Sequence, residues 1–86
     1  NQLEALMKYA HHLKNTHSEP LIAMYVSLLN DYAEQNMGRN HYEFVAQVLL
    51  CAKKLNGGQE AVKRLVAEFR IKYKRRSAMM EVLARF

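Results

Sequence analysis

The sequence predicts an all-α protein: an antiparallel, up-and-down array of four helices with a short fifth helix at the C-terminus. Apolar residues recur at spacings of three and four along most of the 86 residues, which is the repeat of helices that bury one face. Only 3 Gly and 1 Pro are present, too few turn formers for a β-sandwich or barrel. The links between the helical segments are short, and short links make consecutive helices antiparallel neighbours. The array could close as a bundle or stay open as stacked helical hairpins.

The length and composition bound the class of protein. A chain of 86 residues fits one small domain, so we expect residues 1–86 to form a single helical domain. The sequence begins with Asn1 rather than Met, and we expect it to be a fragment of a larger protein. No apolar run approaches the roughly 20 residues that span a bilayer. A single Cys excludes an internal disulfide and favours a cytoplasmic location.

The first two helices are predicted over residues 2–15 and 19–37. Ser18 is a suitable N-cap for the second helix, and Pro20 suits its first turn. Gly38 is expected to end that helix. The apolar stripe of the second helix is wide, which predicts contact on two sides and a central place. The residues predicted to face the core are Leu3, Leu6, Met7, Ala10, Leu13, Leu21, Ile22, Tyr25, Val26, Leu28, Leu29, Tyr32 and Ala33.

The third helix is predicted to start at Asn40. Asn40 followed by Glu43 has the spacing of a capping box, with Asn in place of Ser or Thr. Gly57 and Gly58 are expected to end this helix. The residues that give it a buried face are Phe44, Val45, Val48, Leu49, Ala52 and Leu55.

A fourth helix is predicted from Gln59, with a break near residues 75–77. Ser77 would then cap a short last helix. An unbroken helix over residues 59–85 is the alternative, about 40 Å long, and it would overhang the other helices. Near the C-terminus, Met79, Met80 and Phe86 either close one end of the core or expose an adaptable surface.

The net charge of +5 lies entirely in the last third of the chain. Residues 1–56 carry five basic and five acidic side chains, whereas residues 57–86 carry eight basic and three acidic ones. The excess concentrates in the basic segment, which we define as Arg70, Lys72, Lys74, Arg75 and Arg76.

Two interpretations of the basic segment are open. Clustered Lys and Arg bind polyanions because they release counterions from phosphates, and Tyr73 among them could stack on a base. The segment could instead be a solvated helix end, where cations favour the helix dipole and cap free carbonyls. Tyr73 would then continue the buried stripe of the fourth helix. An acidic protein is a third candidate for its partner.

The sequence predicts no enzyme, no metal site and no cofactor. His11 and His12 point about 100° apart on a helix, while His17 and His41 are expected in a loop and at a helix start. Cys51 lies in an apolar run and is expected in the core as a small hydrophobe. The acidic residues are scattered without a paired acid and base. No glycine loop of the phosphate-binding type is present.

A family pattern covers residues 40–86. A helix over residues 42–55 precedes a glycine turn, and the next helix ends in a Tyr-Lys-Arg-Arg run before a short last helix. The positions that carry the pattern are Val62, Leu65, Val66, Phe69, Arg70, Tyr73, Lys74, Arg75, Arg76, Met79, Glu81 and Leu83. This arrangement resembles the helical C-terminal region that follows the zinc-binding motif of bacterial SWIM zinc-finger proteins.

The resemblance implies an accessory to a zinc module elsewhere in the parent protein. The SWIM family is associated with DNA or protein interaction, and its helical tail has no assigned catalytic role. The zinc ligands of the family are three Cys and one His. They have no counterpart here, because Cys51 is the only Cys, so zinc binding is not carried over to this chain.

We therefore expect a non-catalytic interaction or scaffolding module that serves another domain of its parent protein. A groove or an exposed helical face would receive a peptide or a neighbouring domain. The alternative is an accessory nucleic-acid contact through the basic segment, which would weaken steeply with ionic strength. We expect no membrane partner.

Overall fold

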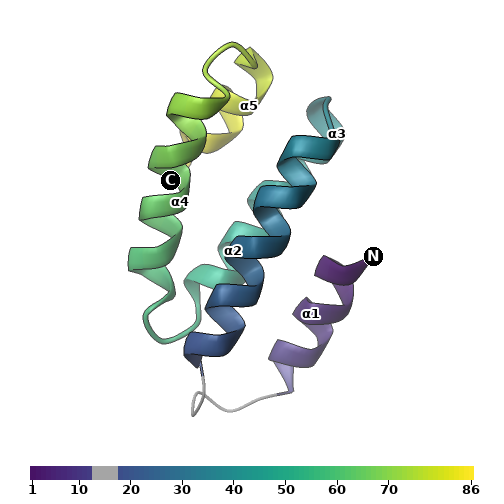
Figure 1. Cartoon of the computed structure of the whole chain (residues 1–86), viewed down its shortest axis with the longest axis vertical. Coiled ribbons are helices and arrows are strands. Elements are labelled where there is room, and N and C mark those ends of the chain that lie inside the picture. Colours follow the sequence, from purple (N-terminus) through teal and green to yellow (C-terminus); the bar gives the residue numbers. More distant parts are fainter. Residues whose placement is uncertain (13–17) are drawn as a thin grey trace.

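The computed structural model describes residues 1–12 and 18–86. These residues form an up-and-down array of α-helices without strands (Figure 1), which confirms the predicted all-α class. The helices are α1 (Gln2–His11), α2 (Ser18–Gln35), α3 (Arg39–Lys53), α4 (Gly58–Lys72) and α5 (Ser77–Leu83).

The helices form an open stack rather than a closed bundle. Beyond its neighbours in sequence, each helix packs only against the next but one, so α1 packs on α3, α2 on α4 and α3 on α5. A closed four-helix bundle would bring α1 against α4, and these two helices do not approach each other. The array therefore has two layers, one with α1, α3 and α5 and one with α2 and α4. The thickness of 18 Å fits two layers at the usual interaxial distance of about 9 Å.

The centre of the stack is α3, which packs against all four other helices. We expected the second helix there, and α2 does contact three others. Burial follows the predicted stripes, with Tyr25, Leu49 and Phe69 among the largest fully buried side chains. Met79 is also fully buried, while Met80 and Phe86 pack against the core. The short last helix thus closes one end of the core, as the first of the two alternatives predicted.

The first helix starts at Gln2 as predicted, whereas the second starts at Ser18, one residue earlier than predicted. Asn1 caps α1 through a capping box with Glu4, whose backbone N–H donates to Asn1 Oδ1 at 2.8 Å. The predicted end of this helix at residue 15 lies outside the described residues. The predicted Ser18 cap is wrong, because α2 already begins at Ser18 and its buried hydroxyl has no hydrogen-bond partner. The helix ends at Gln35, two residues before the predicted end.

The predicted capping box of the third helix is also wrong. Gly38 is the N-cap of α3, and no side chain bonds to the first turn. The N-cap lies two residues earlier than expected, so Asn40 lies inside the helix rather than at its cap. Glu43 does not take part in a cap and instead accepts a hydrogen bond from Arg85. The helix ends at Lys53, before the Gly57-Gly58 pair that was expected to end it.

Glycines make the tight link between α3 and α4. Gly57 has φ +83°, a left-handed conformation that side chains disfavour. A Cβ on Gly58 would collide with the Ala52 carbonyl oxygen, so the start of α4 can approach α3 only without a side chain there. This turn confirms the predicted boundary.

The predicted break in the last third is confirmed, and the unbroken helix is excluded. The α4 helix ends at Lys72 and α5 begins at Ser77. The N-cap of α5 is Arg76, without a side-chain cap bond. The predicted Ser77 cap is therefore wrong, because Ser77 is the first residue of the helix itself.

Candidate functional site

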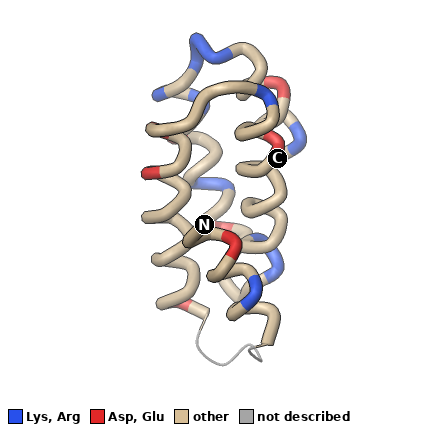
Figure 2. The backbone as a smooth tube through the Cα atoms, turned by 90° about the vertical axis from the view of Figure 1, so that its right-hand side faces the viewer, with Lys and Arg blue, Asp and Glu red and all other residues tan. Residues whose placement is uncertain are grey.

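The basic segment lies at one end of the molecule. Arg70 and Lys72 belong to the last turn of α4, and the other three residues lie in the link to α5. Figure 2 shows basic residues gathered on this link. The segment sits beside the C-terminal end of α2, whose backbone carbonyls have no partners further along that helix.

Two arginines of the basic segment bond to helix carbonyls. Arg76 Nη1 donates to the Ala33 carbonyl oxygen near the end of α2, at 2.6 Å. Its guanidinium also lies 4.2 Å from the centre of the Tyr73 ring, a favourable cation–π distance. Arg70 Nη2 donates to the Leu83 carbonyl oxygen at the end of α5, at 3.0 Å. Arg76 therefore caps a carbonyl without another backbone partner among the described residues, as the solvated-end interpretation of the segment predicted, whereas the Leu83 carbonyl also accepts from the Phe86 backbone N–H.

Tyr73 is packed rather than available for stacking. Its side chain is 5% exposed, its ring lies edge-on to Phe69, and its hydroxyl donates to Glu34 Oε2 at 2.7 Å. Burial raises the pKa of Tyr73. The Tyr73 hydroxyl and the Lys72 ammonium, 3.3 Å away, lower the pKa of Glu34. This side chain thus joins α4 to α2 and leaves no free ring face for a base.

Lys74 and Arg75 are the remaining members of the basic segment. Both are exposed, and within the described ranges neither forms a hydrogen bond or an ion pair. They are the two residues of the predicted nucleic-acid site whose charges have no intramolecular partner among the described residues.

Further ion pairs hold α5 to α3. Arg85 bonds to both carboxylate oxygens of Glu43 at 2.7 Å, and the hydrogen bond from Arg85 lowers the pKa of Glu43. Arg39 Nη2 donates to Glu81 Oε2 at 2.7 Å. Most of the charge at this end of the molecule is therefore paired across helices.

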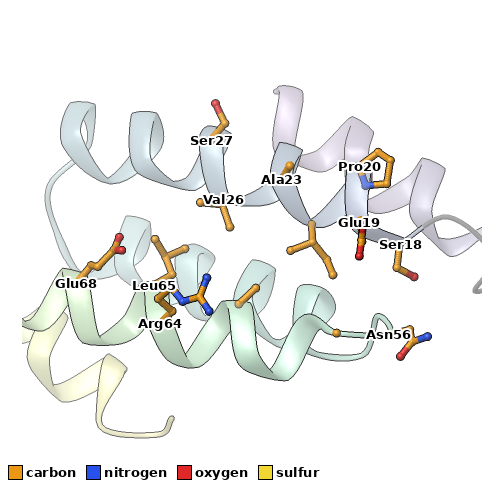
Figure 3. Close-up of a pocket in the computed structure, with 13 residues that line it drawn as sticks. Ser18, Glu19, Pro20, Ala23, Val26, Ser27, Asn56, Arg64, Leu65 and Glu68 are labelled. Carbon is orange, nitrogen blue, oxygen red and sulfur yellow. The ribbon is translucent and has the colours of Figure 1, made fainter.

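An open groove runs between α2 and α4 on the layer that these two helices form. Its volume is about 990 Å³, and Figure 3 shows the side chains that line it. The lining residues come from residues 18–27 of α2, from the turn before α4 and from residues 61–68 of α4: Ser18, Glu19, Pro20, Ile22, Ala23, Val26, Ser27, Asn56, Gly57, Ala61, Arg64, Leu65 and Glu68.

The groove has an apolar floor and charged rims. The half-buried Ile22 and Val26 of α2 face the buried Leu65 of α4 across it. Exposed Glu19 stands on the α2 rim, and exposed Arg64 and Glu68 stand on the α4 rim. The groove does not extend to the C-terminal ends of the two helices, which the contacts of Glu34 with Lys72 and Tyr73 join.

Sequence reasoning did not find this groove. Ile22, Val26 and Leu65 were assigned to the buried stripes, where their spacing places them. A signal was present in the unusual width of the α2 stripe, which exceeds what one neighbour covers. The other exposed large apolar side chains are spread over different parts of the chain: Tyr9, Met24, Met37, Leu50 and Ile71.

The candidate metal and nucleophile residues stay apart. No group of three or more His, Cys, Asp or Glu in the described ranges could hold a metal ion, and His17 lies outside those ranges. His41 Nδ1 lies 2.7 Å from the Tyr32 hydroxyl, which ties α3 to α2. Cys51 is half-buried, so its prediction as a core residue is only partly right. None of the described helices is long and apolar enough to cross a membrane.

Comparison with known proteins gave no match to a family model, to a curated protein or to a solved structure. The resemblance of residues 40–86 to the helical region of SWIM proteins stays a prediction.

Proposed function

We propose that the chain is a non-catalytic interaction module that receives a helix of a protein partner, or of a neighbouring domain, in the groove between α2 and α4. The observation that carries this proposal is the apolar floor of an open groove, where Ile22 and Val26 remain half-buried at the surface of a well-packed domain. Apolar side chains that line a groove gain free energy when a partner removes them from water.

The architecture supports a helix as the occupant. From α3 onward, each helix packs against the two helices that precede it in the sequence. A helix in the groove would likewise pack against two helices, α2 and α4. Exposed Ala23 and half-buried Ala61 line the groove, and small side chains let a helix approach closely. Helix-in-groove binding is a common mode of peptide recognition. The titratable side chains on the rims are two Glu and one Arg, a set that favours recognition over catalysis.

The test uses helical peptides selected from a randomised display library against the intact chain. Amide chemical shifts of the chain should move at residues of the groove, and Ala23→Arg should weaken binding at least about tenfold, because the new side chain fills the groove. The matched control is Ala5→Arg, at an exposed position of α1 outside the groove, and it should leave the affinity unchanged. The proposal would be refuted by peptides that change amide chemical shifts only outside the groove. It would also be refuted by peptides that bind the Ala23→Arg variant as tightly as the native chain.

The second candidate function is nucleic-acid binding, which the exposed, unpaired Lys74 and Arg75 favour. Lys74→Glu with Arg75→Glu should reduce binding to duplex and single-stranded DNA at low salt, and the native affinity should fall steeply as salt rises. Lys53→Glu with Lys54→Glu, another adjacent exposed pair, is the matched control. Equal binding by the native chain and both variants would end this alternative.

The place of the module in a larger protein is a further part of the proposal. The resemblance of residues 40–86 to SWIM proteins supports a role beside a zinc-binding module, and the single Cys supports a cytoplasmic location. The parent protein should then carry a Cys-x-Cys and Cys-x-His pattern before Asn1. A parent sequence without that pattern would remove the SWIM relationship and leave the groove proposal standing.

A further inference from the structure

The groove carries charges that form no ion pair with other residues in the described ranges 1–12 and 18–86. The ion pairs of the described residues involve Glu4, Glu34, Glu43 and Glu81. Glu19, Arg64 and Glu68 form none, although Arg64 and Glu68 are four residues apart on α4. A basic residue before an acidic one is the weaker order for such a pair within a helix. These three side chains are therefore free to meet charges on an occupant.

The direction of an occupying helix follows from the two helices that form the groove. The lining includes the first residues of α2 and the turn just before α4, and the two helices run parallel, with both N-termini at the same end (Figures 1 and 3). Their dipoles point the same way, and an antiparallel helix beside them is favoured electrostatically. The occupant would thus begin near Glu68 and end near Glu19.

We infer, on the basis of the proposed function, that the groove selects an amphipathic helix that runs antiparallel to α2 and α4 and carries a basic residue four positions before an acidic one. Such a helix meets Glu68 first and Arg64 one turn later, about 6 Å along the axis. Its basic residue pairs with Glu68 and its acidic residue with Arg64. A second basic residue near its C-terminal end lies on the opposite flank, beside Glu19.

The length of the groove sets the length of the occupant. Its lining on α2 extends from Ser18 to Ser27, which corresponds to about 14 Å of helix axis. An occupant of about three turns fills that length with one apolar stripe. The partner chemistry is therefore a short amphipathic helix with the order Lys-x-x-x-Glu on one flank.

The experiment compares two synthetic 14-residue peptides of the same composition, both with the same leucine stripe in an alanine background. One carries Lys-x-x-x-Glu and the other Glu-x-x-x-Lys on the flank beside the stripe. At low ionic strength the first should bind about tenfold more tightly, since two attractive pairs replace two repulsive ones, and the difference should shrink in high salt. The second peptide is intrinsically the more helical, so helicity alone would produce the opposite preference.

A charge swap on the protein makes the test reciprocal. Arg64→Glu with Glu68→Arg should reverse the preference toward Glu-x-x-x-Lys. The control Lys63→Glu with Glu60→Lys changes exposed α4 residues that do not line the groove and should keep the native preference. If both peptides bind equally and change the amide chemical shifts of groove residues, the charge inference alone would be overturned. If neither peptide changes the amide chemical shifts of groove residues, both the charge inference and the proposed helix-binding function fail.

Discussion

The two ends of α4 use charge differently. Near its C-terminal end, Arg70 caps α5, Arg76 caps α2, and Lys72 pairs with Glu34. Further toward its N-terminus, Arg64 and Glu68 are exposed on the rim of a groove and form no ion pair within the described part of the chain. One end is closed by contacts between helices, whereas the other leaves both apolar and charged side chains available.

This contrast shows that a high density of charge in the sequence does not measure its availability. The basic segment is conspicuous, yet helix C-termini nearby expose carbonyls that attract cations, and Arg70 and Arg76 bond to carbonyls there. The groove charges are inconspicuous and of mixed sign, and Arg64 and Glu68 lie in the middle of α4, away from the free backbone groups of a helix end. The availability of a charge depends on what the fold places beside it.

The largest contrast is expected from truncating side chains in the two regions. Phe69 is 1% exposed at the closed end, and Phe69→Ala should lower the free energy of unfolding by about 4 kcal/mol because it leaves a cavity. Val26→Ala on the half-buried groove floor should cost about 1 kcal/mol. Urea denaturation of both variants measures the difference. Similar losses in the two variants would mean that the groove is as tightly packed as the core.

A smaller contrast separates two adjacent arginines. Arg76→Ala removes a hydrogen bond to the Ala33 carbonyl and the contact with the Tyr73 ring, and should cost about 2 kcal/mol. Arg75→Ala removes the same charge from an exposed position and should cost less than about 0.5 kcal/mol. Thermal melts monitored by circular dichroism compare the two. An equal loss would show that net charge, rather than capping, sets the stability of this end.

The sequence predicted the helices and their buried faces because periodicity reports burial along each element. Leu49, Phe69 and Met79 are buried where the three- and four-residue spacing placed them. It also predicted the turn at Gly57, since glycine at a helix end is itself a backbone signal. Those parts of the fold depend on local patterns.

The caps and the groove depended on information that local patterns do not contain. Asn40 and Ser77 have the composition of caps, but tertiary packing starts each helix at a different residue. The partners of Arg70 and Arg76 lie 13 and 43 positions away in the sequence, so their roles required the fold. The groove likewise arises from the parallel placement of α2 and α4, which are separated by all of α3.

The smallest expected effect is the acid dependence of the closed end. Neighbouring donors lower the pKa values of Glu34 and Glu43 in the folded chain, so each carboxylate stabilises the fold above its ordinary pKa of 4.5. That stabilisation is lost as the pH falls below 4.5 through the lowered pKa. The contribution is small because these pairs are on the surface and solvent screens them.

Thermal melts between pH 7 and pH 3 at low salt test this dependence. The variant Glu34→Gln with Glu43→Gln should melt at a lower temperature than the native chain at pH 7. Its melting temperature should fall less on acidification, since the paired carboxylates are already absent. Glu19→Gln with Glu68→Gln removes two groove carboxylates that form no ion pair with the described part of the chain, and should keep the native acid slope. If the groove variant flattened the acid slope as much as the paired variant, the distinction between a closed, paired end and an open, unpaired groove would fail.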